Sequence, residues 1–315
     1  MATVVPFTAR RDILKAAVAT AAGVAIGGTA LQRVFAQAQP AAKGDAVLAT
    51  DLHLLTVAQR NVIALTDAGG VLLVNGCIAS EAKTLLDAVA TLSRGGKVHT
   101  LFNTCWHPDN TGLNEVLGPR GATIIAHEHT RLWLTQNVVS PYDGRKFAAL
   151  PENARPNKTF YTRESLTAGG KRVEYGHVRA SPHTSGDTYV FFPDANVLAV
   201  GDAITGRGWP DIDYWTGGWI GGVVGGLEQL LVLANADTRV VPSRGPVLAR
   251  ADLEAQHQMY EVIYERLAQL LNGGRGPDEA LAAKPTAEFD AKMGASDEFV
   301  LRAFKSLWGF LAPDA

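Results

Sequence analysis

The chain has few cysteines and little net charge, and each of these scarcities excludes a class of protein. Only two cysteines occur in 315 residues, which excludes a small fold cross-linked by several disulfides. Its 29 Lys and Arg residues nearly balance its 31 Asp and Glu residues, so it lacks the basic surface of a nucleic-acid-binding protein. Beyond the N-terminus, no apolar run is long enough to span a membrane. We therefore expect a globular protein without a nucleic-acid partner.

The N-terminus has the pattern of an export signal. Arg10 and Arg11 precede the apolar stretch Ala16–Leu31, and Ala36-Gln37-Ala38 follows as an Ala-x-Ala cleavage site. The paired arginines resemble those of a twin-arginine signal. An uncleaved anchor helix is the alternative, although the stretch is short and rich in Ala and Gly for a membrane span. We predict a signal peptide over residues 1–38 and a periplasmic or secreted mature protein, free of the membrane.

After a linker over residues 39–46, the first half of the chain alternates between strands and helices. Strands at Val71–Val74 and Val98–Phe102 flank an amphipathic helix that begins after Ser80, so the strands should be parallel and end on the same side of a sheet. Further apolar runs predict strands around Leu54–Val57, Val62–Leu65 and Ala122–Ala126, then a helix at His127–Gln136 and a surface loop at 137–160.

The second half is again rich in strands, and its glycines cluster. Strands are expected at Lys171–Arg179, Thr188–Phe192, Val197–Val200 and Arg239–Val241. Residues 217–226 predict a glycine-rich loop leading into a helix at Leu227–Ala236, and Arg250–Leu271 predicts a long amphipathic helix. Two stacked β-rich halves with helices outside predict an αββα sandwich over residues 47–315, with a helical C-terminal tail from about residue 272.

Polar side chains that could bind a metal gather in four stretches after apolar runs. The stretches are Asn103–Asn114 with Cys105, His107, Asp109 and Asn110, the segment around His183, Gly201-Asp202, and Val241–Pro246 with Arg244. A thiol, an imidazole and a carboxylate aimed from the end of one strand can converge on a metal ion.

The order and spacing of these stretches resemble the metallo-β-lactamase superfamily, whose zinc signature is His-x-His-x-Asp-His. The resemblance extends along essentially the whole mature chain. It implies a metal-dependent hydrolase of the αββα fold acting on a small molecule. It also implies a first zinc site on Cys105, His107 and His183, completed by Asp202 or water, with Asp109 and Asp202 as catalytic groups.

Two departures from the family pattern argue against a second metal. Asn110 stands where the signature has its last His, and Arg244 stands where the family has a late His. A neutral amide is a weak zinc ligand, and a guanidinium has no acceptor. We expect Arg244 to replace the second metal electrostatically by pairing with Asp109 and Asp202. A surface arginine is the alternative.

Cys105 leaves two outcomes open. It can bind a single zinc ion together with His107 and His183. Alternatively it can form a disulfide with Cys77, because both follow the carboxyl ends of adjacent parallel strands and an exported protein can be oxidised. The first outcome predicts a hydrolase of an ester, thioester or lactam-like carbonyl. The second predicts a non-catalytic, metal-free relative that binds a small ligand or a partner in the same cleft.

Two weaker signals lie outside these stretches. Trp209 and Trp215 belong to an aromatic segment that either forms a wall of the substrate site or packs in the core. His127 and His129 look like a metal pair, but a spacing of two on a helix directs side chains to different faces. We therefore expect capping or packing roles for these histidines, and a structural role for His177.

Overall fold

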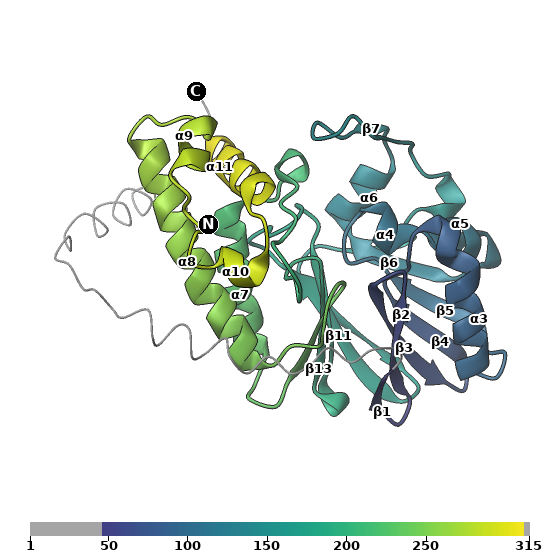
Figure 1. The fold of residues 1–315 in the computed structure, drawn as a ribbon. Coiled ribbons are helices and arrows are strands. Elements are labelled where there is room, and N and C mark those ends of the chain that lie inside the picture. The colour runs from purple at the N-terminus through teal and green to yellow at the C-terminus, as the bar shows by residue number, and fades with distance from the viewer. Residues whose placement is uncertain (1–45, 312–315) are drawn as a thin grey trace, which may run out of the picture. The chain divides into compact units, whose positions relative to one another are not determined.

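The computed structural model describes residues 46–311, which form two β-sheets packed face to face with helices outside them (Figure 1). The predicted signal peptide and all but the last residue of the predicted linker lie outside the described residues. Among the residues described, no helix is long and apolar enough to cross a membrane. The predicted αββα sandwich with additional C-terminal helices is confirmed.

The first sheet has seven strands in the order β1-β2-β3-β4-β5-β6-β9. Strands β1 to β4 are antiparallel neighbours, whereas β4, β5, β6 and β9 run parallel. The predicted parallel pairing across the helix α3 (Ala82–Leu92) is thereby confirmed. The strands are β1 (Ala46–Ala49), β2 (Leu52–Val57), β3 (Arg60–Asp67), β4 (Gly70–Val74), β5 (Val98–Phe102), β6 (Thr123–His127) and β9 (Lys158–Phe160).

The second sheet has five strands in the order β10-β11-β12-β13-β14, all antiparallel except the parallel pair β13 and β14. Its strands are β10 (Arg163–Ala168), β11 (Lys171–His177), β12 (Thr188–Phe192), β13 (Val197–Gly201) and β14 (Arg239–Pro242). A separate hairpin, β7 (Val138–Val139) and β8 (Lys146–Phe147), lies in the segment between α6 (Glu128–Leu134) and β9. The expected loop at 137–160 therefore contains three short strands.

The main core lies between the two sheets, because alternate residues of each strand point to opposite faces. In β4, Leu72 and Val74 face the second sheet, where they join Tyr175 and Val190, whereas Val71 and Leu73 pack under α3. Every residue of β4 is therefore buried. This is why its sequence is a continuous apolar run rather than an alternating one.

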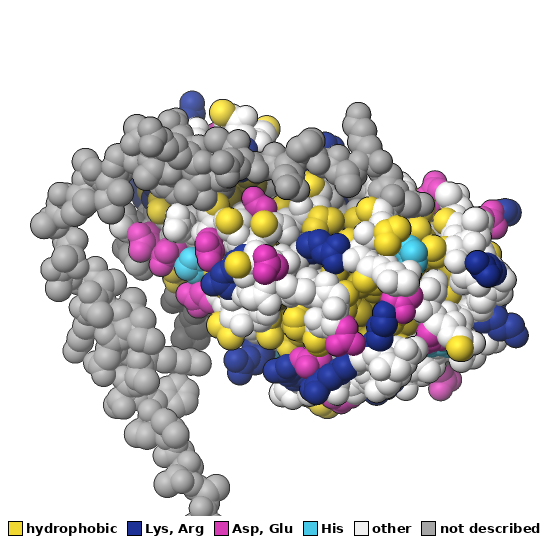
Figure 2. Space-filling view, turned by 90° about the horizontal axis from the view of Figure 1, so that it is seen from below, with side chains coloured by type: hydrophobic (Ala, Val, Ile, Leu, Met, Phe, Trp, Pro, Cys, Tyr) yellow, Lys and Arg dark blue, Asp and Glu magenta, His cyan; other side chains and the backbone are white. Residues whose placement is uncertain are grey.

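The helices outside the sheets are α3 with α4 (Pro108–Thr111), α5 (Asn114–Leu117) and α6 on the side of the first sheet, and α7 (Ile220–Leu233) with α8 (Arg250–Asn272) on the side of the second (Figure 1). The tail adds α9 (Pro277–Ala282), α10 (Asp290–Met293) and α11 (Asp297–Leu311), of which α11 packs against α7, α8 and α9. Figure 2 shows basic and acidic side chains interspersed on the face that it draws.

The glycine-rich segment is helical, so the predicted loop at 217–226 is wrong. Helix α7 begins at Ile220 and contains four of the six glycines. A Cβ atom on Gly222 would lie 2.3 Å from the carbonyl oxygen of Ala180 and 2.4 Å from that of Ser181. The glycines therefore let the helix pack directly on the backbone before His183, and this close contact outweighs their poor helix propensity.

Candidate metal centre

The backbone that carries Cys105 is fixed from both sheets. After β5 ends, the Thr104 N–H and hydroxyl both donate to Asn75 Oδ1, at 3.0 and 2.8 Å. Asn75 follows β4 and has a positive φ of 66°. On the other side, the Thr188 N–H of β12 donates to the Thr104 carbonyl at 2.8 Å. These bonds set the direction in which the next side chain, the buried Cys105, points.

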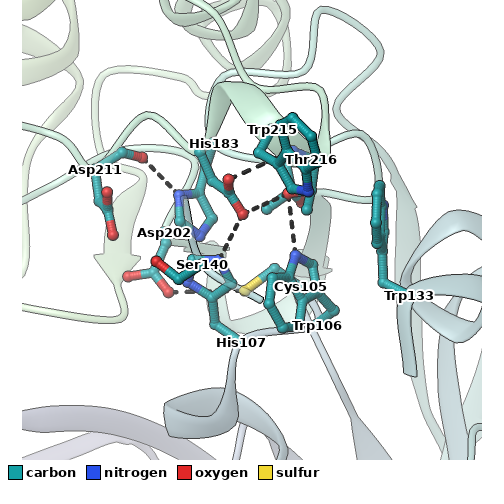
Figure 3. Close-up of polar contacts among 12 residues, drawn as sticks. Cys105, Trp106, His107, Trp133, Ser140, His183, Asp202, Asp211, Trp215 and Thr216 are labelled. Carbon is teal, nitrogen blue, oxygen red and sulfur yellow. Dashed lines mark hydrogen bonds and ion pairs between the residues drawn. The ribbon is translucent and has the colours of Figure 1, made fainter. Parts of the chain in front are cut away.

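Three side chains converge in the way a tetrahedral metal site requires. One ligand atom from each of Cys105, His107 and His183 lies within 4.8 Å of the others (Figure 3). The sequence stretches at Asn103–Asn114 and around His183, which are separated by about a quarter of the chain, are thus brought together. A thiolate and two imidazoles form a sound donor set for zinc.

In each histidine one ring nitrogen, here called the outer nitrogen, already has a hydrogen-bond partner. The other ring nitrogen is left to bind a metal. His107 Nε2 lies 3.1 Å from Asp213 Oδ2, and His183 Nδ1 lies 2.6 Å from the carbonyl oxygen of Asp211 (Figure 3). His183 Nε2 is buried without a hydrogen-bond partner. Support of this kind fixes the tautomer and ring orientation of a zinc-binding histidine, so the residues present fit a zinc ion.

The loop that presents His183 is held by Asp187. Its buried carboxylate accepts from the backbone N–H of His183 at 2.7 Å and from that of Thr184 at 2.9 Å. This role of Asp187 was not predicted from the sequence. An acid four residues after a candidate ligand, in a Gly-Asp turn, is the signal that could have identified it.

Asp202, predicted together with water as a possible fourth ligand, is not one of the three converging side chains, and other residues hold its carboxylate. Its Oδ2 accepts from Asn110 Nδ2 at 2.6 Å, and its Oδ1 accepts from Arg60 Nη1 at 3.0 Å and from the Ser243 hydroxyl. Cys105 Sγ lies 3.9 Å from Oδ2. Because both oxygens already have close donors, a solvent molecule is a better fourth ligand than this carboxylate.

Arg60 is the close partner of both acids of the site, whereas Arg244 only approaches Asp202. Arg60 forms ion pairs with Asp109 and with Asp202, and its side chain is only 13% exposed. Arg244 is 46% exposed, and its Nε lies 3.9 Å from Asp202 Oδ1. Arg60 therefore makes the close ion pairs that were predicted for Arg244, and the replacement of a second metal by an arginine stays a prediction.

No local pattern distinguishes Arg60, which begins β3 after a two-residue turn. The turn residues Ala58 and Gln59 both have positive φ angles, 49° and 63°. The neighbouring Asn61 ties this turn to the late loop, because its Nδ2 donates to the carbonyls of Pro242 and Gly245, each at 2.9 Å. The β2–β3 hairpin is thus docked on the loop that carries Arg244.

Asn110 has a bonding role that a histidine at this position would not fill in the same way. Its amide nitrogen donates to Asp202 at 2.6 Å and also to Cys105 Sγ at 3.0 Å. A side-chain amide has two N–H donors, one for each acceptor. Asn110 and Arg60 together therefore place a hydrogen-bond donor on each oxygen of Asp202.

Burial and neighbouring charge act in opposite directions on the titrating groups. Burial raises the pKa of the Cys105 thiol, an effect that the adjacent His183 reduces. Burial opposes protonation of His183, but Cys105, Asp187 and Asp202 raise its pKa well above the usual value. Burial likewise opposes ionisation of Asp202, yet His183, Arg60 and Arg244 lower its pKa overall. His107 helps to lower the pKa of Asp213 to about 2 against the effect of burial.

Both cysteines are free and buried, so the structure does not contain the Cys77–Cys105 disulfide. Cys77 packs in the apolar layer under α3 with Leu85 and Leu113, and burial raises its pKa to about 11. Cys105 instead faces the histidines. The two thiols leave adjacent strands, but they belong to different layers of the sandwich.

A cavity of about 310 Å³ opens beside His107, the one of the three candidate ligands that lines it. Trp215 lines it and is 58% exposed, whereas Trp209 does not line it. Trp209 stacks on Phe299 with ring centroids 4.5 Å apart and donates to the Gly294 carbonyl, so its placement in a substrate wall is corrected. The residues lining the cavity include Arg60, Trp106, His107, Asp109, Tyr142, Phe147, Asp211, Asp213, Trp215, Arg244 and Arg302.

Three further histidines, His127, His129 and His177, pack together, and none of them lines the cavity. The rings of His127 and His177 lie parallel with centroids 3.8 Å apart, and His129 meets His127 edge-on at 4.9 Å. His127 ends β6 and caps α6, accepting from the His129 N–H at 3.2 Å. The predicted capping and packing roles agree with these contacts, although the expectation that the His127 and His129 rings would point apart is wrong.

The family model described as the metallo-beta-lactamase superfamily matches residues 55–254. A metallo-beta-lactamase from Pontibacter korlensis superposes with a TM-score of 0.54 at 16% identity, covering 69% of this chain and 98% of that one. The sec-alkylsulfatase Pisa1 from Pseudomonas sp. gives 0.63 at 15% identity, covering 86% of this chain and 51% of that one. Identities this low show the fold alone. Comparison with curated protein sequences gives no match.

Proposed function

Because the chain belongs to the metallo-beta-lactamase superfamily, we propose that it is a hydrolase with a single zinc ion that cleaves an ester, thioester or lactam-like carbonyl. The observation that carries the proposal is the convergence of Cys105, His107 and His183 within 4.8 Å beside a cavity. Bound there, zinc would supply a Lewis acid that acidifies a water molecule and polarises the substrate carbonyl.

The chain's own residues have distinct tasks in this reaction. Asp213 and the Asp211 carbonyl orient the two histidines through their outer nitrogens. Asp109 lines the cavity as a carboxylate paired with Arg60, and it accepts a hydrogen bond from the attacking water and orients it. Asp202 acts indirectly, because its contacts with Asn110 hold the amide against Cys105.

The cavity walls favour a substrate with an apolar part. Trp106, Phe147 and Trp215 provide aromatic surface, which excludes water from one side of the reacting group. Arg244 lines the same cavity with nearly half of its side chain exposed, so it can pair with a negatively charged part of the substrate.

Zinc content and thiol content of the purified mature protein test the proposal together. We expect about one zinc per chain, two free thiols, and hydrolysis of an activated ester that Cys105→Ser abolishes along with the zinc. Cys77→Ala is the matched control, because Cys77 packs in the core away from the ligands and its replacement should leave the zinc in place. A protein with no zinc and no free thiols would contradict the proposal.

A metal-free binding protein is the second candidate, and one observation favours it. Asp202 is fully hydrogen-bonded and both site acids are paired with Arg60. Arg60, with Arg244 nearby, thus compensates the negative charge of the two acids without a metal ion, as a cleft that only binds a ligand would require. Two free thiols without zinc, and a small-molecule complex without turnover, are the results that select this candidate.

We also propose that the protein is exported in folded form through its twin-arginine signal, on the strength of Arg10, Arg11 and the Ala-x-Ala pattern. The mature protein should begin directly after Ala38. Replacing both arginines by lysine should leave the full-length precursor in the cytoplasm, as cell fractionation and N-terminal sequencing would reveal. Normal processing of that variant would exclude the twin-arginine route.

A further inference from the structure

Arg302 of the C-terminal helix α11 contacts the supports of both candidate zinc-binding histidines. It lies outside the stretch that matches the family, residues 55–254. Its guanidinium forms an ion pair with Asp211, and it lies over the ring of Tyr142 with Cζ 4.1 Å from the ring centroid. The side chain lines the cavity and is 18% exposed.

The first contact leads to His183. Arg302 binds the carboxylate of Asp211, and the backbone carbonyl of the same residue accepts from His183 Nδ1 at 2.6 Å. Asp211 belongs to no helix or strand, since it lies in the connection between β13 and α7. The position of its carbonyl therefore depends on what its side chain binds.

The second contact leads to His107. The Tyr142 hydroxyl donates to Asp213 Oδ1 at 2.9 Å, and the other oxygen of Asp213 lies 3.1 Å from His107 Nε2. Tyr142 is in the short loop between β7 and β8, which is itself outside the two main sheets. A guanidinium stacked on the ring restricts where this loop can place the hydroxyl.

Helix α11 is a rigid base for these contacts. Phe304 and Leu307 are fully buried, and the Ser306 hydroxyl accepts from the backbone N–H of Ile220 at 3.1 Å. Within α11 itself, Glu298 pairs with Arg302 one helical turn away. The guanidinium is therefore aimed at the cavity by a helix that is packed into the core.

We propose that Arg302 is a positioning residue for the zinc site: by binding Asp211 and Tyr142 at once, it fixes the outer nitrogens of His183 and His107. The inference rests on the proposed zinc site. It assigns the C-terminal tail a role in metal affinity, because ligands held in place before binding lose less entropy when the ion binds.

Zinc affinity of the mature protein, measured by competition with a chelating dye, tests the proposal. Arg302→Met should weaken binding by about 10- to 100-fold, the usual effect of losing support behind a metal-binding histidine. Lys305→Met is the matched control, because it removes the same charge from an exposed position of the same helix, and it should change the affinity about twofold or less. Arg302→Lys keeps the charge without the planar fork and should be intermediate.

Two further measurements separate positioning from a general loss of structure. The absorption spectrum of the cobalt-substituted protein should change in Arg302→Met and not in Lys305→Met, because it reports ligand geometry. Tyr142→Phe keeps the ring under Arg302 and removes the hydroxyl, which donates to Asp213 and accepts from the Trp215 N–H, so it should weaken zinc binding even if Arg302→Met does not fold. If Arg302→Met folds and its zinc affinity and cobalt spectrum are unchanged, the proposal is overturned. If only Tyr142→Phe folds, unchanged affinity and spectrum in that variant overturn it.

Failure of the zinc hypothesis has a different signature. If the wild-type protein binds no zinc, the proposed function is wrong. The positioning role is then read from the imidazole nitrogen chemical shifts of His107 and His183 in the metal-free protein. Arg302→Met should shift both sets of resonances and Lys305→Met neither, and unshifted resonances in Arg302→Met would overturn the positioning role as well.

Discussion

At the scale of single residues, Arg60 determines the charge balance of the site. It is the partner of two acids, one of which, Asp202, has a side chain only 7% exposed. Replacing Arg60 by Gln should lower the free energy of unfolding by about 3 kcal/mol, because a buried carboxylate loses its cation. Urea unfolding at neutral pH measures this loss.

Arg244→Gln is the comparison that gives the Arg60 result its meaning. Arg244 is half exposed and 3.9 Å from the same carboxylate, so its loss should cost about 1 kcal/mol or less. Equal destabilisation by the two substitutions would mean that the charge of Asp202 is shared between both arginines and that Arg60 has no special role.

Asp213 is a second residue with a measurable task. It orients His107 through a 3.1 Å contact, so Asp213→Asn should weaken zinc binding by about 10- to 100-fold with little change in the fold. Asp143→Asn, at an exposed acid on the β7–β8 loop, serves as the control in the same chelator competition. If Asp213→Asn binds zinc as tightly as the wild-type protein does, Asp213 does not orient His107 for metal binding.

The sequence allowed the ligands to be predicted but not the residues around them. Cys105, His107 and His183 follow apolar runs at recognisable spacings, so their convergence could be expected before the structure. Arg60 lies 142 residues from Asp202 in the sequence, and nothing in its local pattern distinguishes it from a surface arginine. Only the docking of the β2–β3 hairpin on the loop after β14 brings the two together.

At the scale of elements, the packing of helix α7 requires glycine, although glycine has a poor helix propensity. A Cβ atom at Gly222 would lie 2.3 Å from a backbone oxygen, and backbone cannot move aside as a side chain can. Gly222→Ala should therefore destabilise the protein by at least about 2 kcal/mol, as thermal or urea unfolding would measure.

A matched glycine in another helix should behave in the opposite way. Gly309 in α11 has nothing within 4 Å of the site of a Cβ atom. Gly309→Ala should stabilise the protein by about 0.5–1 kcal/mol through helix propensity alone. The pair of opposite signs tests the close packing of α7, and stabilisation by both substitutions would contradict it.

The same contrast explains which elements the sequence could predict. Strands β4 and β5 with α3 between them follow from apolar periodicity, because burial on known faces dictates their residues. The start of helix α7 could not be predicted in this way, because glycine is required there by contact with residues 180 and 181 of another segment. Strands β9 and β10 were missed because their residues are largely polar and partly exposed.

At the scale of the whole molecule, the two sheets meet at the stacked rings of His127 from β6 and His177 from β11. Burial lowers the pKa of each to about 4, and the other charged or titrating groups that influence the pair are His129, Glu128 and Arg179. Between pH 6.5 and pH 4 the unfolded chain binds protons that the folded chain excludes. Stability should therefore fall as the pH is lowered through this range.

Unfolding free energies at pH 7 and pH 5 test the histidine stack. The wild-type protein should be less stable at pH 5 than at pH 7. His177→Gln should reduce this difference in unfolding free energy, because glutamine binds no proton in the unfolded chain. Substitution of His99, a partly exposed histidine paired with Asp67, should leave the loss at pH 5 unreduced. An undiminished pH difference in His177→Gln would show that other groups control the acid sensitivity.

The most direct test of the account is X-ray absorption at the zinc edge of the zinc-loaded mature protein. One zinc on Cys105, His107 and His183 predicts a single sulfur at about 2.3 Å with nitrogen or oxygen ligands at about 2.0–2.1 Å. It also predicts no zinc–zinc vector at about 3.5–4 Å. A first shell without sulfur, or a metal–metal vector in a protein that carries Arg60, Asn110 and Arg244, would contradict the single-zinc site.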